Sequence, residues 1–249
     1  MSKLLRADLS VLFRSKLFYG MIFLCIFLPA VTNLAVYLSE PGAPLLVPSV
    51  TLTMFLCMFV GIFVGGLALI LISAEFTSGE IRNKLIMGHK RSDIFASWVI
   101  VYSLEMLIAI IVFFGVFLLS GIIIGYDMSV CDFGEILMNM LVITVMFFGN
   151  SLALSILITI ILPDTKAFII FYVLYEALAV PGILLYEMYP DSIIVKIINR
   201  CFALSYLSLE DRALIVGFDE PWFTIACSLV FGVVIMAIAK LLFDRKDLK

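Results

Sequence analysis

The chain has 249 residues, of which 64% are hydrophobic and 14% are charged, and its formal net charge at pH 7 is −3. A soluble domain carries about 45–50% apolar and about 25% charged residues. This composition therefore excludes an ordinary soluble domain and indicates a polytopic membrane protein. The positions of the basic residues are more informative than the net charge, because Lys and Arg in short loops set the orientation of membrane spans.

A short amphipathic segment, residues 1–17, precedes the first apolar run. Leu5, Leu9, Leu12 and Phe13 recur in it at helical spacing, with basic residues among them. This pattern predicts an interfacial helix that rests among lipid headgroups, where its basic residues either contact anionic lipid or only set the orientation. We expect no cleavable signal peptide, because the first apolar run exceeds a typical h-region and no A-x-A site follows it.

Six apolar runs reach the length of about 20 residues that a helix needs to cross the hydrocarbon core. The predicted spans are residues 18–38, 49–72, 95–124, 136–162, 167–186 and 222–243. Pro29, Pro181 and Gly182 mark expected kinks or breaks, and Gly61 and Gly65 have a spacing that lets helices approach closely. The sequence thus predicts an all-α protein with one transmembrane domain and no soluble domain.

Basic residues collect on one side of the predicted spans. That side holds Lys3, Arg6, Arg14, Lys16, Arg82, Lys84, Lys90, Arg91, Lys166, Lys240, Arg245, Lys246 and Lys249. The other side holds only Lys196, Arg200 and Arg212. Since positive loops stay inside, we expect both termini to be cytoplasmic.

A polar stretch, residues 74–92, separates the second and third spans on the cytoplasmic side. Thr77 and Glu80 have the spacing of a capping box, which predicts a short helix that begins after Thr77. Gly88 stands where a helix needs a left-handed residue to stop. The stretch therefore predicts a structured, cationic surface of the kind that another protein can bind.

The external stretch, residues 187–221, predicts two short helices that dip back onto the bundle. Its first helix would have an apolar face and a polar face, formed by Ile194, Ile197, Ile198 and Cys201 on one side and Lys196, Asn199 and Arg200 on the other. Ser208, before Asp211, is a possible cap for the second. Cys131 and Cys201 both fall in predicted external loops, so either a disulfide or two free thiols fits the sequence.

Sequence motifs for chemistry are sparse. No G-x-x-x-x-G-K-[ST] segment is present to cradle phosphate. His89 is the one histidine, and it is expected to be a solvated surface residue, so we predict no metal site. We accordingly expect a chain that is not an enzyme by itself, binds no cofactor and does not read nucleic acid.

Two carboxylates fall deep inside predicted spans. Glu105 is about ten residues into the third span, or about 15 Å from its cytoplasmic end, and Glu176 lies about nine residues into the fifth. An ionised carboxylate at that depth costs several kcal/mol. Each side chain is therefore either a neutral interhelical hydrogen-bonding group or part of a pathway for cationic substrate groups.

The polar stretch resembles the cytoplasmic loop of the permeases of type-2 ABC exporters, the six-helix class. The pattern there is an acidic residue, a Gly-Thr-x-basic-Asn-x-Leu segment, a Gly and an Arg, and it is matched here by Glu75, Gly79, Asn83, Leu85, Gly88 and Arg91. The chain departs from it with Glu80 where Thr is usual and with Trp98 where Lys often stands. The resemblance is specific over about 20 residues, and the predicted architecture resembles the family over the whole chain.

The resemblance implies a coupling helix that docks on a separate cytosolic ABC ATPase, with ATP and Mg bound on that partner. The implied coupling residues are Glu75, Gly79, Glu80, Arg82, Asn83, Lys84, Leu85, Gly88 and Arg91. The implied assembly has two ATPase copies and a second permease copy, as a homodimer in a bacterial cell membrane. An external gate would include Ile194, Ile197, Ile198, Arg200 and Asp211.

The resemblance also implies export of an amphipathic or hydrophobic peptide or drug-like substrate, with Glu105 and Glu176 near the pathway. The alternative is a stand-alone ion-coupled carrier that uses these two carboxylates as protonatable sites. Such carriers often have inverted repeats and paired broken helices, and neither stands out in this sequence. An intramembrane enzyme is disfavoured because no paired catalytic groups lie close in sequence.

Overall fold

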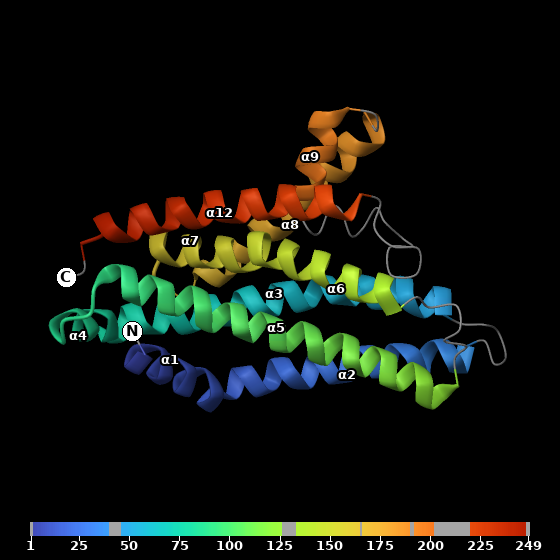
Figure 1. Ribbon diagram of the computed structural model, residues 1–249, viewed down its shortest axis with the longest axis horizontal. Helices are drawn as coiled ribbons and strands as arrows, with labels where there is room; N and C mark the ends of the chain where they lie inside the picture. The colour runs from blue at the N-terminus through green and yellow to red at the C-terminus, as the bar shows by residue number, and fades with distance from the viewer. Residues whose placement is uncertain are drawn as a thin grey trace.

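The computed structural model describes residues 2–39, 46–125, 133–164, 166–189, 192–201 and 220–247, and the regular structure among them is helical. Figure 1 shows long helices lying side by side in an elongated bundle. The helices are α1 (Ser2–Arg14), α2 (Lys16–Ser39), α3 (Leu46–Ser78), α4 (Glu80–Ile86), α5 (Arg91–Ile124), α6 (Phe133–Phe147), the π-helical turn η2 (Phe148–Leu152), α7 (Ala153–Ile161), α8 (Ala167–Met188), α9 (Ile193–Cys201) and α12 (Pro221–Arg245).

Five segments of the described chain are long and apolar enough to cross a membrane as helices. They are Lys16–Ser39, Phe59–Ser78, Arg91–Ile124, Leu137–Ile161 and Pro221–Arg245. Each falls on one of the predicted spans, so the all-helical, multi-pass character is confirmed. Helix α8 coincides with the predicted span 167–186 but is not among the five, and a sixth span stays a prediction. Pro29 and Pro181 lie inside continuous helices, so neither ends one.

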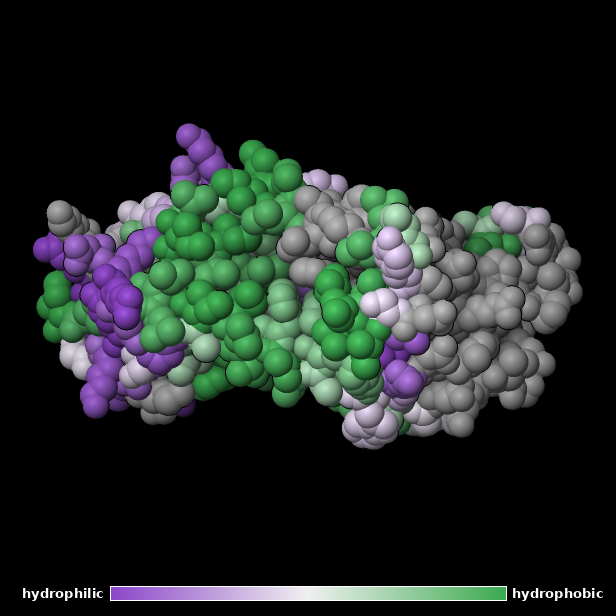
Figure 2. All heavy atoms as spheres, turned by 90° about the horizontal axis from the view of Figure 1, so that it is seen from above, coloured by the Kyte–Doolittle hydropathy of each residue, from purple (hydrophilic) through white to green (hydrophobic). Residues whose placement is uncertain are grey.

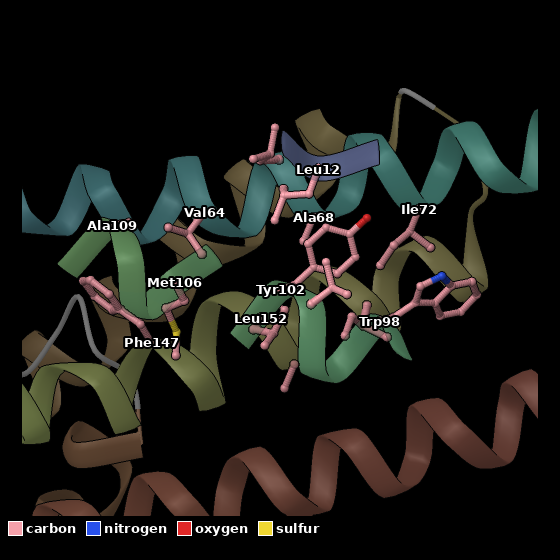
Figure 3. Packing of buried hydrophobic residues seen from close by; sticks show 14 of the residues in the cluster. Leu12, Val64, Ala68, Ile72, Trp98, Tyr102, Met106, Ala109, Phe147 and Leu152 are labelled. Atoms are coloured by element: carbon pink, nitrogen blue, oxygen red, sulfur yellow. The ribbon is translucent and has the colours of Figure 1, made fainter. Parts of the chain in front are cut away.

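The interior is built where α2 packs along α5 and α3, and where α12 packs along α6, η2 and α7. Figure 3 shows Leu12 of α1 reaching toward Ala68 of α3 and Tyr102 of α5 in this interior. Trp98 of α5, fully buried, lies near Ile72 of α3 in the same view. Since lipid tails are as apolar as these side chains, close packing rather than water exclusion holds such helices together.

The predicted span 136–162 is one rod with an irregular turn in its middle. A π-helical turn, η2, separates α6 from α7, where the sequence predicted an uninterrupted helix. A Cβ on Gly149 would lie 2.7 Å from the Ser228 carbonyl oxygen, and one on Gly232 would lie 2.8 Å from the Gly149 Cα. The irregular turn therefore coincides with the place where two backbones touch, between η2 and α12.

Helix α4 and the two chain ends lie at the same end of the bundle, at the left of Figure 1. Hydrophilic residues gather at that end in Figure 2, next to a broad apolar surface. We call it the polar end. Exposed apolar side chains such as Phe23, Phe27 and Ile111 belong to the long helices beyond it, as expected for surfaces that face lipid.

Candidate functional site

Helix α4 begins two residues later than the capping-box pattern predicts. Helix α3 continues through Thr77, whose hydroxyl donates to the Ser73 carbonyl oxygen at 3.0 Å. The residue before α4 is Gly79, with φ 75°, and no side chain caps the helix. The predicted capping box of Thr77 and Glu80 is therefore wrong: Thr77 is a helical residue of α3, and the left-handed Gly79 makes the corner.

The end of α4 follows the prediction. Gly88 has φ 90°, the left-handed conformation that stops a helix. Its N–H donates to the Leu85 carbonyl at 3.0 Å, and the His89 N–H donates to the Lys84 carbonyl at 3.1 Å. This pair of bonds is a Schellman motif. Helix α4 is thus a short rigid element bounded by a left-handed glycine at each end.

A buried charge cluster, made of Asp8, Glu75, Lys84, Ser97 and Trp98, joins α4 to the bundle. Lys84 Nζ lies 2.9 Å from Asp8 Oδ1 and 2.7 Å from Glu75 Oε2. Ser97 Oγ donates to Asp8 Oδ2 at 2.5 Å, and Trp98 Nε1 donates to Glu75 Oε2 at 3.0 Å. One lysine on α4 therefore ties together carboxylates from α1 and α3, and α5 supplies both neutral donors.

The electrostatics of the cluster depend on burial. Lys84 is 9% exposed, Asp8 7% and Glu75 6%. Burial alone would lower the pKa of Lys84, but the Glu75 and Asp8 carboxylates outweigh it, so that pKa is raised from its ordinary value of 10.5. Removing one member of such a cluster leaves uncompensated charge in the interior, which is costly.

Asp8 is the member of the cluster that the sequence reasoning missed. That reasoning gave the helix one apolar face, Leu5, Leu9, Leu12 and Phe13, resting among lipid headgroups; in the structure Phe13 is 45% exposed, whereas Leu12 is buried in the bundle. The buried stripe is Leu4, Asp8 and Leu12, spaced four residues apart. An acidic residue in line with two leucines at this spacing is the signal that could have found it.

Arg91, in the first turn of α5, caps the last turn of α12. Its Nη1 lies 2.8 Å from the carbonyl oxygens of Phe243 and Lys246 and 2.9 Å from that of Asp244. A cation at a helix C-terminus satisfies orphan carbonyls and opposes the helix dipole. Arg91 thus joins the start of one predicted span to the end of another.

Lys246 holds the chain that follows α12 against the bundle. Its ammonium donates to the Ile160 carbonyl oxygen at the end of α7, and it lies 5.0 Å from the centroid of the Phe76 ring. Burial lowers the pKa of Lys246 from its ordinary value. The last turns of α3, α7 and α12 therefore converge behind α4.

The outer face of α4 is exposed. Glu80, Arg82 and Asn83 point outward, and the two apolar residues at the tip, Ile86 and Met87, are 74% and 69% exposed. A cleft of about 180 Å³ lies beside the α3–α4 corner, lined by residues that include Gly79, Arg82, Pro163 and Lys246.

The predicted coupling residues are thus divided between two environments. Glu75, Lys84 and Arg91 hold helices together from inside or beneath the surface, and Leu85 is half-buried. Gly79 and Gly88 shape the two ends of α4. The remaining three, Glu80, Arg82 and Asn83, are free to meet a partner.

Of the two predicted intramembrane carboxylates, the structure describes the side chain of one, Glu105. Glu105 is fully buried in α5, and neither of its carboxyl oxygens has a hydrogen-bond partner in the described part of the chain. Glu176 lies in α8, at a position whose side chain is outside what the structure describes.

The predicted external segment is described only in its first helix, α9. Ile194 is 66% exposed and Ile197 39%, whereas Val195 and Arg200 are each 7% exposed, so α9 does not pack with the predicted apolar face. Arg200 Nη1 pairs with Glu220 Oε2 at 2.9 Å, and its guanidinium carbon lies 4.7 Å from the centroid of the Phe223 ring. This pairing explains how a predicted polar-face residue came to be buried.

The structure describes only part of the other features predicted for the external segment and for its cysteines. Ile198 is half-buried in α9. Cys201 is a free thiol whose Sγ lies 3.9 Å from the Cys227 carbonyl oxygen. Asp211, Ser208 and Cys131 lie outside the described residues, so the second external helix stays a prediction, and the free Cys201 thiol fits the alternative of two unpaired thiols rather than the disulfide.

Within the described ranges, no group of three or more His, Cys, Asp or Glu side chains is placed to hold a metal ion. The site is built from one lysine, two carboxylates and two neutral donors, which together join α1, α3, α4 and α5. No protein-family model matches this chain, and no curated protein sequence matches it.

Proposed function

We propose that this chain is the membrane subunit of an ATP-driven exporter, and that α4 is the helix through which a separate cytosolic ATPase moves the spans. The observation that supports this most is the opposite character of the two sides of α4. Its inner side buries Ile81 and Lys84, and its tip exposes Ile86 and Met87, which are 74% and 69% exposed. Exposed apolar residues beside charged ones suit a protein–protein contact.

The buried charge cluster gives α4 a mechanical connection to the bundle. Displacing α4 outward would separate Lys84 from Asp8 and Glu75 and strand charge in the interior. The less costly response is for α1 and α3 to follow α4. A partner that holds α4 differently in two nucleotide states would therefore shift the equilibrium between two arrangements of the spans, by differential binding.

The proposed assembly contains two copies of an ABC ATPase, which bind ATP and Mg, and a second copy of this chain as a homodimer. In this proposal α8 is the fifth of six spans, and the polar end with both termini faces the cytoplasm of a bacterial cell. The chain itself contributes no catalytic group. Its proposed cargo is an amphipathic or hydrophobic peptide or drug-like molecule that leaves the cell.

A stand-alone ion-coupled carrier is the second candidate. The observation that favours it is Glu105, fully buried in a predicted span, with both carboxyl oxygens unpartnered among the described residues. Intramembrane carboxylates often mark proton or ion pathways. In this case the activity would need Glu105 and no ATPase.

The first experiment is purification of the tagged chain from its native host in mild detergent, with mass spectrometry of the proteins retained. The exporter proposal expects a stoichiometric partner that carries a Walker A loop. An intact, monodisperse chain that repeatedly retains no such ATPase would contradict it. Reconstituted transport abolished by Glu105→Gln without any ATPase would then favour the carrier.

A second experiment locates the contact on α4. The double variant Ile86→Ser/Met87→Ser removes exposed apolar area and should release the ATPase without lowering the unfolding temperature. Lys240→Met, which removes a charge from an exposed ion pair with Asp244, is the control and should retain the partner. Arg91→Glu is a poorer test, because Arg91 also caps α12. Retention of the ATPase by the double variant would overturn the assignment of α4.

A further inference from the structure

An open apolar groove runs between α2 and α3 and begins at the first residues of α2. Its α2 wall is Leu17, Gly20, Met21 and Leu24, and its α3 wall is Phe63, Gly66, Leu67 and Ile70, with Phe168 of α8 at one side. Each wall repeats with the three- and four-residue spacing of one helical face. The groove has a volume of about 280 Å³.

The width of the groove comes from its glycines. A Cβ on Gly20 would meet no atom within 4 Å, so its position is open space on the α2 wall. A Cβ on Gly66 would lie 2.5 Å from the Phe168 ring, so the α3 wall has room only for that ring. The remaining space follows α2 from Lys16 to Leu24, a length of about 12 Å at about 1.5 Å per residue.

One cationic residue, Lys16, lies at the end of this groove where α2 begins. Lys16 is the first residue of α2 and lines the groove, and its side chain is exposed. No carboxylate in the described part of the chain pairs with it. The first N–H groups of α2, which lack partners within the helix, lie at the same end and also favour an anion.

We propose that the groove binds one anionic glycerophospholipid, with an acyl chain between α2 and α3 and the headgroup phosphate at Lys16. The groove has the polarity of such a molecule, because its apolar walls end at Lys16, which pairs with no carboxylate in the described part of the chain. Basic pockets at the cytoplasmic ends of membrane helices are known to take anionic headgroups. The site does not depend on the proposed exporter function.

Two features argue against other occupants. The volume of about 280 Å³ lies below the roughly 300–1,000 Å³ of typical small-ligand pockets, so a folded peptide does not fit. A second copy of the chain would bring an apolar helix face, which offers nothing to Lys16. An acyl chain with a phosphate satisfies both parts of the groove.

The test is native mass spectrometry of the delipidated chain with equal amounts of palmitoyl-oleoyl phosphatidylglycerol and phosphatidylcholine. The wild type should retain phosphatidylglycerol in preference. Lys16→Gln should lower that preference about fivefold, which corresponds to about 1 kcal/mol per basic residue near a membrane surface. The control is Lys3→Gln, which removes the same charge from an exposed position outside the groove.

The acyl-chain half of the site has its own pair of variants. Gly20→Leu should fill the groove and lower binding of both lipids. Gly115→Leu is the matched control, because a Cβ on Gly115 of α5 also meets no atom within 4 Å and Gly115 does not line the groove. Leu17→Trp, at a groove residue that is 50% exposed, is a second way to fill it.

Three results would overturn the proposal. Equal loss of phosphatidylglycerol with Lys16→Gln and Lys3→Gln would mean that only net charge matters. Equal binding by the two glycine variants, with thermal unfolding showing both to be folded, would mean that the groove is empty of lipid. A change of oligomeric state with Gly20→Leu, with unchanged lipid binding, would assign the groove to a second copy.

Discussion

Arg91 Nη1 lies 2.8 Å from the carbonyl oxygen of Phe243, a residue 152 positions further along the chain. The contact joins the first turn of α5 to the last turn of α12. It places a cation among carbonyl oxygens at the end of α12, where the last C=O groups lack N–H partners within the helix. The polar end of the bundle is therefore held together by side chains at helix termini as well as by the packed interior.

Replacing Arg91 with Gln should loosen the end of α12. The variant loses charge-assisted hydrogen bonds to carbonyls, which contribute about 1.5–3 kcal/mol for a bond to a charged group. Amide hydrogen exchange should accelerate in residues 241–247 and change little in α2. Arg91→Lys should recover only part of the effect, because lysine cannot present a planar fork of donors. Unchanged exchange in that segment would mean that the cap is not formed.

Lys84→Met should destabilise the chain strongly because it strands Asp8 and Glu75. Breaking one partner of a buried ionic group costs about 3–5 kcal/mol. The matched control is Lys240→Met, since the Lys240–Asp244 pair is exposed and an exposed pair is worth about 0–1 kcal/mol. Denaturant unfolding in mild detergent measures both. Adding Asp8→Asn and Glu75→Gln to Lys84→Met should restore part of the loss, and equal effects of the two lysine variants would contradict a buried cluster.

The contribution of Lys84 to the free energy of unfolding should also depend on pH. The pKa of folded Lys84 lies above its ordinary value of 10.5, because the two carboxylates outweigh burial. A raised lysine pKa contributes stability that is complete below 10.5 and is lost as the pH rises through the folded-state value. The difference in unfolding free energy between wild type and Lys84→Met should therefore be constant near neutral pH and should narrow above 10.5. A difference that already narrows between pH about 6 and about 8 would point to another titrating group.

The two glycines at the ends of α4 should tolerate substitution less well than a glycine inside a helix. Gly79 and Gly88 have φ of 75° and 90°, and no atom lies within 4 Å of a Cβ at either, so alanine there is opposed by backbone strain alone. We expect Gly79→Ala and Gly88→Ala each to cost about 1–2 kcal/mol. Gly115→Ala, in α5, should instead be stabilising by about 0.5–1 kcal/mol. The three unfolding midpoints test this, and a stabilised Gly79→Ala would exclude the left-handed corner.

The long helices were predictable because their signal is local. Length and hydropathy placed α2, α5 and α12 within a few residues of their observed bounds, and the left-handed Gly88 followed from its position after the helical residues of α4. The buried charge cluster was not predictable in the same way. Asp8 and Lys84 lie 76 residues apart, so neither one's pairing is visible in the pattern around it.

The misplaced start of α4 has a similar origin. Thr77 is a helical residue of α3, which continues past the predicted cap to Ser78, and the chain turns where Gly79 permits it. In α9, the side chain of Arg200 is buried because it pairs with Glu220, which lies 20 residues further along the chain. Local sequence patterns identify helices well but identify their partners poorly. A buried polar group is stabilised by the side chains that pack against it, and these can lie far away in the sequence.

The π-helical turn η2 has a consequence for how the rod around it tolerates change. A π turn fits about one residue more into a single turn than an α-helix does, so η2 takes up the extra residue while α6 and α7 keep their facing. Deleting one residue within 148–152 should therefore give a regular helix in which buried Ser155 and Thr159 still face the interior. The turn thus lets the rod carry an additional residue without changing which of its sides packs on α3, α5 and α12.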